Sequence, residues 1–307
     1  GEPERLQKTA HYLALLAEGE GQTAAFEDAF ELPVRRLEEE LAAYAAAGRY
    51  PSISVPLTRL PSGRDVSVRR LPPADVPVLL GDLSAQIGRP DRARDLYHRA
   101  LELAAAHPEA LSGLAALEDA TGSLGEAEIL HRDAFASGRL SARGHLRYGR
   151  HLFARFQAAR SQDEREPLSE RARTVLAQAA ALEPDNALVA AALGRAHLLP
   201  PADPAAGLAP LERAFRALPE QTGWAFDLVQ LAVRAGRFDL ARAWVEGVLR
   251  RWADPEMLGR AEEEIERGEL LHAAEQAWEE GELERAVELY DRAVSATRDP
   301  DLRRQME

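Results

Sequence analysis

A recurring interval of about 34 residues constrains the fold of this chain more than any other feature, because repeats of this length are typical of paired helices. Ala93 and Ala127 are separated by this interval, and so are Gly88 and Gly122. Each alanine follows a turn and lies in a segment whose apolar residues have helical spacing. Paired helices bury their apolar faces by stacking on their neighbours. Residues 74–307 are therefore predicted to form one array of helix pairs.

The same pattern returns at longer intervals further along the chain. Ala172 follows Ala127 by one interval plus a surplus, which we place in the charged segment "RFQAARSQDEREP". Ala241 and Ala286 are separated in the same way, and the surplus "DPEMLGRAEEEIE" is interpreted as an extra helix. Small residues at a helix crossing let two backbones approach closely, so all of these alanines are predicted to be buried. About six units are expected, at residues 74–107, 108–141, 142–184, 185–221, 222–255 and 267–300.

Two segments of the predicted array share a Leu-Gly pair. "LLGDLSAQIGRPDRARDLYHRAL" contains the pair Leu80-Gly81 and, in the following helix, Tyr97. "AALGRAHLL" repeats the pair as Leu193-Gly194. In these motifs the chain resembles the tetratricopeptide-repeat family. The resemblance implies an all-α, right-handed solenoid that serves as a protein–protein interaction scaffold.

The residues before the array have a different character. Residues 1–50 show helical spacing of apolar residues, whereas residues 51–73 contain two β-branched stretches around "PSG", which predicts a β-hairpin. "HYLALLAEGEGQTAAFEDAFELPVRRLEEELAAYAAAGRYPSISVPL" resembles the end of bacterial gluzincin-type metallopeptidase domains that precede tetratricopeptide repeats. The HExxH helix of that family would lie upstream of this sequence. The alternative function is therefore a non-catalytic accessory region of a larger metallopeptidase.

The composition argues against several classes of function. The formal net charge of −13 at pH 7 disfavours general binding to nucleic acid or to anionic membranes, because both need a basic surface. The absence of cysteine excludes disulfides, thiol catalysis and thiolate zinc sites. No apolar run approaches the ~20 residues of a membrane span. The compartment stays open, since a cysteine-free chain suits the cytoplasm and the periplasm equally.

The histidines form no ligand motif within any single segment. None of the eight histidines lies in HExxH, and His145 and His151 are six residues apart, which puts them on different faces of a helix. The segment "GEGQTAAF" lacks the lysine and the hydroxyl residue of a phosphate-binding loop. We therefore expect no bound metal, no cofactor and no catalytic activity in this chain.

A binding surface is the remaining functional hypothesis. In an array of this kind the first helix of each pair lines a concave groove, and Arg150, Arg195 and Arg234 fall on first helices of consecutive units. A guanidinium can hold a carboxylate through two parallel hydrogen bonds, and a nearby aromatic ring can receive an apolar side chain. The predicted partner is a protein or peptide with acidic groups or a free C-terminal carboxylate. In the alternative, the arginines pair with local carboxylates and serve the fold.

Helical spacing from the Leu-Gly pairs predicts which positions of the first helices face inward. Other inward-facing positions on those helices are Asp82, Gln86, Asp119 and Arg143. The predicted partner-binding residues are Arg150, Phe153, Arg195, Phe226, Gln230, Arg234 and Trp278.

Overall fold

The computed structural model describes residues 3–47 and 70–296 of the 307-residue chain. The chain divides into an N-terminal unit that ends at Arg69 and a larger unit that begins at Arg70. All regular structure in the described ranges is helical. The β-hairpin predicted at residues 51–73 lies outside the described residues except for its last four positions, which are not in a strand.

The N-terminal unit consists of three helices within its described range. These are α1 (Pro3–Ala17), α2 (Gln22–Phe30) and α3 (Val34–Ala47). Tyr12 of α1 contacts Phe26 and Phe30 of α2 edge-on, with ring centroids 6.3 Å apart in both cases. Ala25 of α2 is fully buried. The predicted helical character of the first 50 residues is confirmed for the described part.

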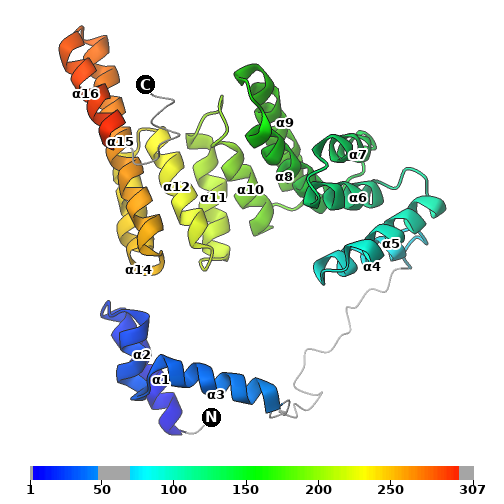
Figure 1. Cartoon of the computed structure of the whole chain (residues 1–307), viewed down its shortest axis with the longest axis horizontal. Coiled ribbons are helices and arrows are strands. Elements are labelled where there is room, and N and C mark those ends of the chain that lie inside the picture. Colours follow the sequence, from blue (N-terminus) through cyan, green and yellow to red (C-terminus); the bar gives the residue numbers. More distant parts are fainter. Residues whose placement is uncertain (1–2, 48–69, 297–307) are drawn as a thin grey trace. The chain divides into compact units, whose positions relative to one another are not determined.

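The larger unit is a succession of helix pairs, which Figure 1 shows side by side in chain order. Helices within a pair pack against each other, and short turns join them except between α10 and α11, where the connection is residues 197–204. The pairs are α4 (Asp75–Gln86) with α5 (Pro90–Leu103), α6 (Pro108–Ala120) with α7 (Leu124–Ala136), α8 (Ala142–Ala158) with α9 (Gln162–Leu182), α10 (Ala187–Ala196) with α11 (Ala205–Ala217), α12 (Thr222–Arg234) with α13 (Phe238–Trp244), and α15 (Pro255–Glu279) with α16 (Leu283–Ala296).

Two helices of the array differ from a simple pair. Helix α13 continues through a π-helical segment (Val245–Leu249) into the short helix α14 (Arg250–Trp252). The prediction of a separate helix in "DPEMLGRAEEEIE" is wrong, because this segment is continuous with the first helix of the last pair in the 25-residue helix α15. Asp254 caps α15 by accepting a hydrogen bond from the backbone nitrogen of Met257 at 2.8 Å. No residue after this cap interrupts the helix until Glu280.

The small residues that mark the repeat lie at the helix crossings. Ala93, Ala127, Ala172, Ala241 and Ala286 are all 0% exposed, which confirms their predicted burial. Each lies in the second helix of its pair, where a larger side chain would push the two backbones apart. The recurring interval of the sequence therefore marks the positions at which the two helices of each pair pack most closely.

Tyr97 of α5 occupies space that two glycines leave open. A Cβ atom added to Gly81 of α4 would lie 2.7 Å from Cε1 of Tyr97, and one added to Gly113 of α6 would also collide with the ring. Tyr97 is almost completely buried between these two first helices. Its hydroxyl is thereby directed toward Asp82 of α4.

Candidate functional site

Side chains from the first and third helix pairs define the inner face of the array. Asp82 of α4 accepts hydrogen bonds from Arg143 Nη1 and Arg147 Nη2 of α8, both at 2.6 Å. Helix α6 lies between α4 and α8 in the succession of first helices. Side chains of the outer two of three neighbouring helices can meet only on the inner side of their curve. We call the side of the first helices that carries these residues the inner face.

Asp82 is the centre of a buried ionic network on the inner face. Besides the two arginines, Tyr97 Oη donates a hydrogen bond to Asp82 Oδ1 at 2.8 Å. Burial alone would raise the pKa of Asp82, but the charge of Arg147 and the hydrogen bonds from Arg147, Tyr97 and Arg143 outweigh it and hold this pKa below its ordinary value. Asp82 is therefore an ionised carboxylate with its partners in place. At this end of the inner face, the network links the helix pair α4/α5 to the pair α8/α9.

A second cluster of polar side chains lies where the pairs α6/α7 and α8/α9 meet. We call Asp119 of α6, Glu128 and His131 of α7, and His151 of α8 the histidine cluster. His151 Nδ1 lies 2.6 Å from Asp119 Oδ1, and His151 Nε2 lies 3.0 Å from Glu128 Oε2. His131 Nε2 lies 3.0 Å from Asp119 Oδ2. Both imidazoles are completely buried.

The pKa values of the two histidines of the cluster shift in opposite directions. Burial lowers the pKa of His151, but hydrogen bonds to Asp119 and Glu128 reverse this effect and raise its pKa above the ordinary value. Burial lowers the pKa of His131 more than its bond to Asp119 raises it. The cluster therefore favours the protonated form of His151, which lies between two carboxylates, and disfavours the protonated form of His131.

Arg150 extends the inner face along α8. It follows Arg143 by seven residues and Arg147 by three, so the three arginines lie on one face of the helix. Arg143 and Arg147 are bound to Asp82, whereas Arg150 is exposed and has no hydrogen bond or ion pair within the described part of the chain. Its guanidinium is available to a ligand.

Arg195 and Arg234 each make one polar contact with the neighbouring helix pair. Arg195 Nε of α10 lies 3.0 Å from Asp227 Oδ2 of α12. Arg234 Nη1, at the end of α12, donates a hydrogen bond to the carbonyl oxygen of Leu198 at 2.6 Å. Burial raises the pKa of Asp227, and the charge of Arg195 offsets only part of that rise. Each of these arginines therefore contacts the neighbouring helix pair through one nitrogen, and its other N–H groups have no partner in the described residues.

The predicted aromatic residues lie in three different environments. Phe153 is half-buried and packs against the apolar cores of its own and the following helix pair. Phe226 is also half-buried, with the guanidinium of Arg260 5.1 Å from the centre of its ring. Trp278 on α15 is 59% exposed, and Gln230 on α12 is half-buried. Whether these residues bind a partner stays a prediction.

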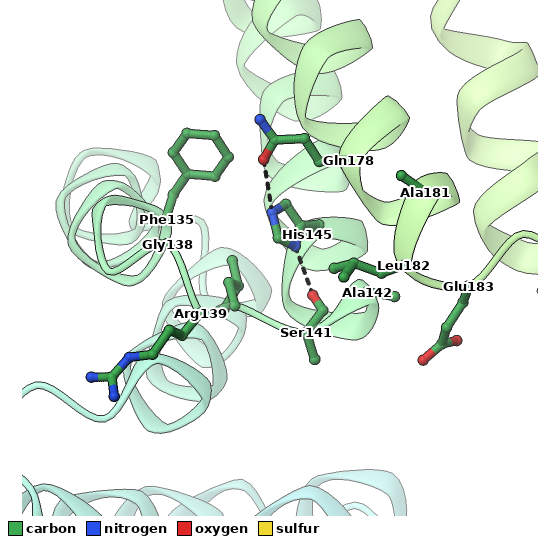
Figure 2. A pocket seen from close by; sticks show the side chains of 11 residues that line it. Phe135, Gly138, Arg139, Ser141, Ala142, His145, Gln178, Ala181, Leu182 and Glu183 are labelled. Atoms are coloured by element: carbon green, nitrogen blue, oxygen red, sulfur yellow. Dashed lines mark hydrogen bonds between the residues drawn. The ribbon is translucent and has the colours of Figure 1, made fainter.

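A cavity lies at the junction of α7, α8 and α9, and none of the predicted partner-binding residues lines it (Figure 2). It measures about 670 Å³, and apolar side chains from Phe135, Leu140 and Leu182 line much of it. His145 beside the cavity is satisfied internally, since Nδ1 lies 2.8 Å from the Ser141 carbonyl oxygen and Nε2 lies 3.1 Å from Gln178 Oε1. These bonds leave no ring nitrogen of His145 for a ligand.

Comparisons with known proteins bear on the helical array. No family model and no curated protein matches the chain. Among solved structures, a thermophilic tetratricopeptide-repeat protein of Thermus thermophilus is 24% identical, covering 62% of this chain and 98% of its own, with a TM-score of 0.45. YrrB, described as a tetratricopeptide-repeat protein with an unusual peptide-binding site, is 14% identical over 62% of this chain and 91% of its own, with a TM-score of 0.49. PilW, a type IV pilus biogenesis factor, is 16% identical over 72% of this chain and 92% of its own, with a TM-score of 0.47.

These likenesses concern the fold alone, and its assignment rests on features of the chain itself. They give no support to the metallopeptidase resemblance of the N-terminal segment. The larger unit consists of short helix pairs with buried alanines at the recurring interval of the sequence. It has the tetratricopeptide-repeat architecture. No helix in the described parts of the chain combines the length and the apolar character needed to cross a lipid bilayer.

The histidine cluster of this tetratricopeptide array was not found from the sequence, where only Asp119 was selected. A signal was nevertheless present, because His131 follows Tyr97 by one repeat interval. In both pairs the second helix thus places a hydrogen-bonding ring at the same position, and the ring reaches a carboxylate on the first helix. His151 and Glu128 join the cluster only through the packing of α7 against α8.

Proposed function

We propose that the array is a non-enzymatic protein-interaction scaffold. Its inner face binds an extended peptide that carries acidic groups or a free C-terminal carboxylate. Arg150, Arg195 and Arg234 supply the positive charge, and Trp278 supplies an exposed apolar surface. Phe153 contributes less than the sequence suggested, because it is half-buried in the core.

The unused N–H groups of the three arginines are the observation that carries this proposal. A guanidinium has five N–H donors, and two adjacent ones bind a carboxylate with parallel hydrogen bonds. Arg195 uses Nε for Asp227, which leaves the pair on Nη1 and Nη2. Arg234 uses Nη1, which leaves Nε and Nη2. Arg150 uses none within the described residues.

Because the whole protein is negatively charged, an acidic ligand can bind only where several arginines lie close together. With a formal net charge of −13, the chain repels acidic peptides at long range. Attraction must therefore come from arginines close to the ligand, and added salt should weaken it. A neutral peptide with an amidated C-terminus should bind more weakly than the same peptide with a free carboxylate.

The test is a binding experiment with a mixed-sequence peptide library prepared in two forms, one with free C-terminal carboxylates and one amidated. The protein is immobilised and the retained peptides are quantified for wild type and for Arg150→Gln. This variant removes an arginine without an internal partner in the described residues, so we expect an unchanged thermal midpoint. We expect the wild type to enrich acidic or free-carboxylate peptides and Arg150→Gln to lose at least half of that enrichment.

The matched control is Arg216→Gln. Arg216 lies on the second helix α11, where it pairs with Glu212 and is 73% exposed. It carries the same charge as Arg150 but lies on the other helix of its pair. Equal loss of enrichment in both variants would indicate an effect of net charge and contradict the proposed site. Failure of the wild type to enrich any acidic peptide would contradict the proposed function.

A further inference from the structure

The histidine cluster brings together three residues that have the donor atoms of a metal site. Nitrogen atoms of His131 and His151 and a carboxylate oxygen of Asp119 all lie within 4.8 Å of one another. We propose that Asp119, His131 and His151 bind one divalent transition-metal ion, with Zn²⁺ as the favoured ion. This inference is independent of the peptide-binding proposal, which depends on Arg150, Arg195 and Arg234.

The donor set suits zinc better than the harder cations. Two imidazole nitrogens with one carboxylate oxygen are a common protein ligand set for Zn²⁺, whereas Mg²⁺ and Ca²⁺ prefer oxygen donors alone. Three protein ligands leave a further position for water. The exposed edge of Asp119, whose side chain is 22% exposed, would provide the route by which the ion and this water enter.

Outer residues already hold His151 in the orientation that a metal ligand needs. Its Nε2 donates to Glu128, which leaves Nδ1 directed at Asp119. Glu128 in turn accepts a hydrogen bond from Arg171 Nη2 of α9 at 3.0 Å. Metal-binding histidines generally donate their second N–H to a carboxylate that is itself held by other groups. An ion bound to Nδ1 of His151 would leave the bond from Nε2 to Glu128 in place.

His131 presents one ring nitrogen to the proposed site. It is completely buried, its Nε2 faces Asp119, and its Nδ1 has no hydrogen-bond partner within the described residues. Coordination would use Nε2, the nitrogen that points into the cluster, and would leave Nδ1 without a partner in the described part of the chain.

The sequence-based expectation of no metal depended on spacing within one helix. His131 and His151 are on α7 and α8, and their separation in sequence says nothing about their separation in space. The alternative to a metal site is a purely structural network, in which the two ring nitrogens of His151 bridge Asp119 and Glu128 by hydrogen bonds. The two readings differ in what happens when metal is added.

The test is titration of the chelator-treated full chain with ZnCl₂ by calorimetry, together with thermal unfolding with and without zinc. We expect one zinc per chain and a higher thermal midpoint with zinc, since an ion that binds only the folded state stabilises it. Asp119→Asn and His131→Gln should each weaken zinc binding at least tenfold. Glu128→Gln should weaken it about 10- to 100-fold by releasing His151. His98→Gln, which removes an exposed histidine of α5, should bind as wild type does.

A measurement on the unmodified protein covers the case in which a variant fails to fold. Co²⁺ in place of Zn²⁺ should give the strong visible absorption of a four- or five-coordinate ion at one equivalent, and zinc should displace it. Absence of stoichiometric zinc binding in the wild type would overturn the proposal. So would a weak six-coordinate cobalt spectrum, or unchanged affinity in folded His131→Gln.

Discussion

The hydroxyl oxygen of Tyr97 lies 2.8 Å from Oδ1 of Asp82, so the second helix of the first pair donates directly to a carboxylate on the first helix. His131, one repeat interval later, makes the corresponding bond to Asp119 at 3.0 Å. Both carboxylates also bind a residue of α8, which is Arg147 for Asp82 and His151 for Asp119. The first and second helix pairs are thus each bonded to the third pair, through carboxylates that accept a bond from equivalent positions, Tyr97 and His131. These hydrogen bonds give Asp82, His131 and His151 polar partners in an array whose core is mainly alanine and leucine.

The first prediction concerns the space that Tyr97 occupies. Gly113→Ala should lower the free energy of unfolding by about 1–3 kcal/mol, because the added methyl group would overlap the tyrosine ring. Gly259→Ala on α15 is the matched control, since nothing lies within 4 Å of a Cβ atom there. It should raise stability by about 0.5–1 kcal/mol through helix propensity. Urea denaturation of both variants measures the difference, and equal behaviour would show that the ring moves aside freely.

The second prediction concerns the ionic network around Asp82. Asp82→Asn should cost about 3 kcal/mol at pH 7, because it leaves the buried guanidinium of Arg147 without its counter-charge. Arg147 already has one buried nitrogen, Nη1, without a partner in the described residues, so it has little other compensation. Urea denaturation at neutral pH gives the magnitude. A loss below about 1 kcal/mol would show that water replaces the carboxylate easily.

The lowered pKa of Asp82 predicts how the stability of the protein depends on pH. The pKa of Asp82 is lower in the folded protein than in the unfolded chain, so its contribution is fully present above the unfolded pKa of about 3.9 and is lost as pH falls through the folded pKa. The stability difference between wild type and Asp82→Asn should therefore be constant from pH 7 to about pH 5 and should shrink below about pH 4. Denaturation midpoints measured from pH 7 to 2 test this, and a constant difference down to pH 2 would contradict it.

The third prediction concerns Asp227, whose pKa shift has the opposite sign to that of Asp82. Burial raises its pKa above the ordinary value, and the contact with Arg195 lowers it only in part. Folding therefore favours the protonated form, and the resulting stability is present below the unfolded pKa and lost as pH rises through the folded pKa. At pH 7 the ionised carboxylate costs stability. Asp227→Asn should leave the free energy of unfolding unchanged or raise it by up to about 1 kcal/mol, since the half-exposed Arg195 loses little.

Urea denaturation of Asp227→Asn at pH 7 provides the measurement. Arg195→Gln is its counterpart, because it leaves Asp227 ionised and without its cation. That variant should be less stable than Asp227→Asn. The reverse order would mean that the ion pair itself stabilises the junction between α10 and α12.

The sequence by itself determined the helix pairs of the larger unit and the residues at their crossings. Ala93, Ala127 and the later alanines were identified from their interval and are buried. This succeeded because apolar spacing and turn glycines act over a few residues, and each pair must bury the same face as its neighbours. The continuous helix α15 was not foreseen, because the insertion carries the same helical pattern as the repeat that follows it.

Only the tertiary structure decided which side chains meet across the pairs. The contacts of Asp82 with α8 and of Arg195 with Asp227 depend on the curve of the array. The meeting of His131 with His151 depends on the register of α7 against α8. Residues far apart in the sequence are brought together by the cumulative placement of several helices, and no local spacing encodes it. The burial of a residue was therefore predictable from the sequence, whereas the identity of its partner was not.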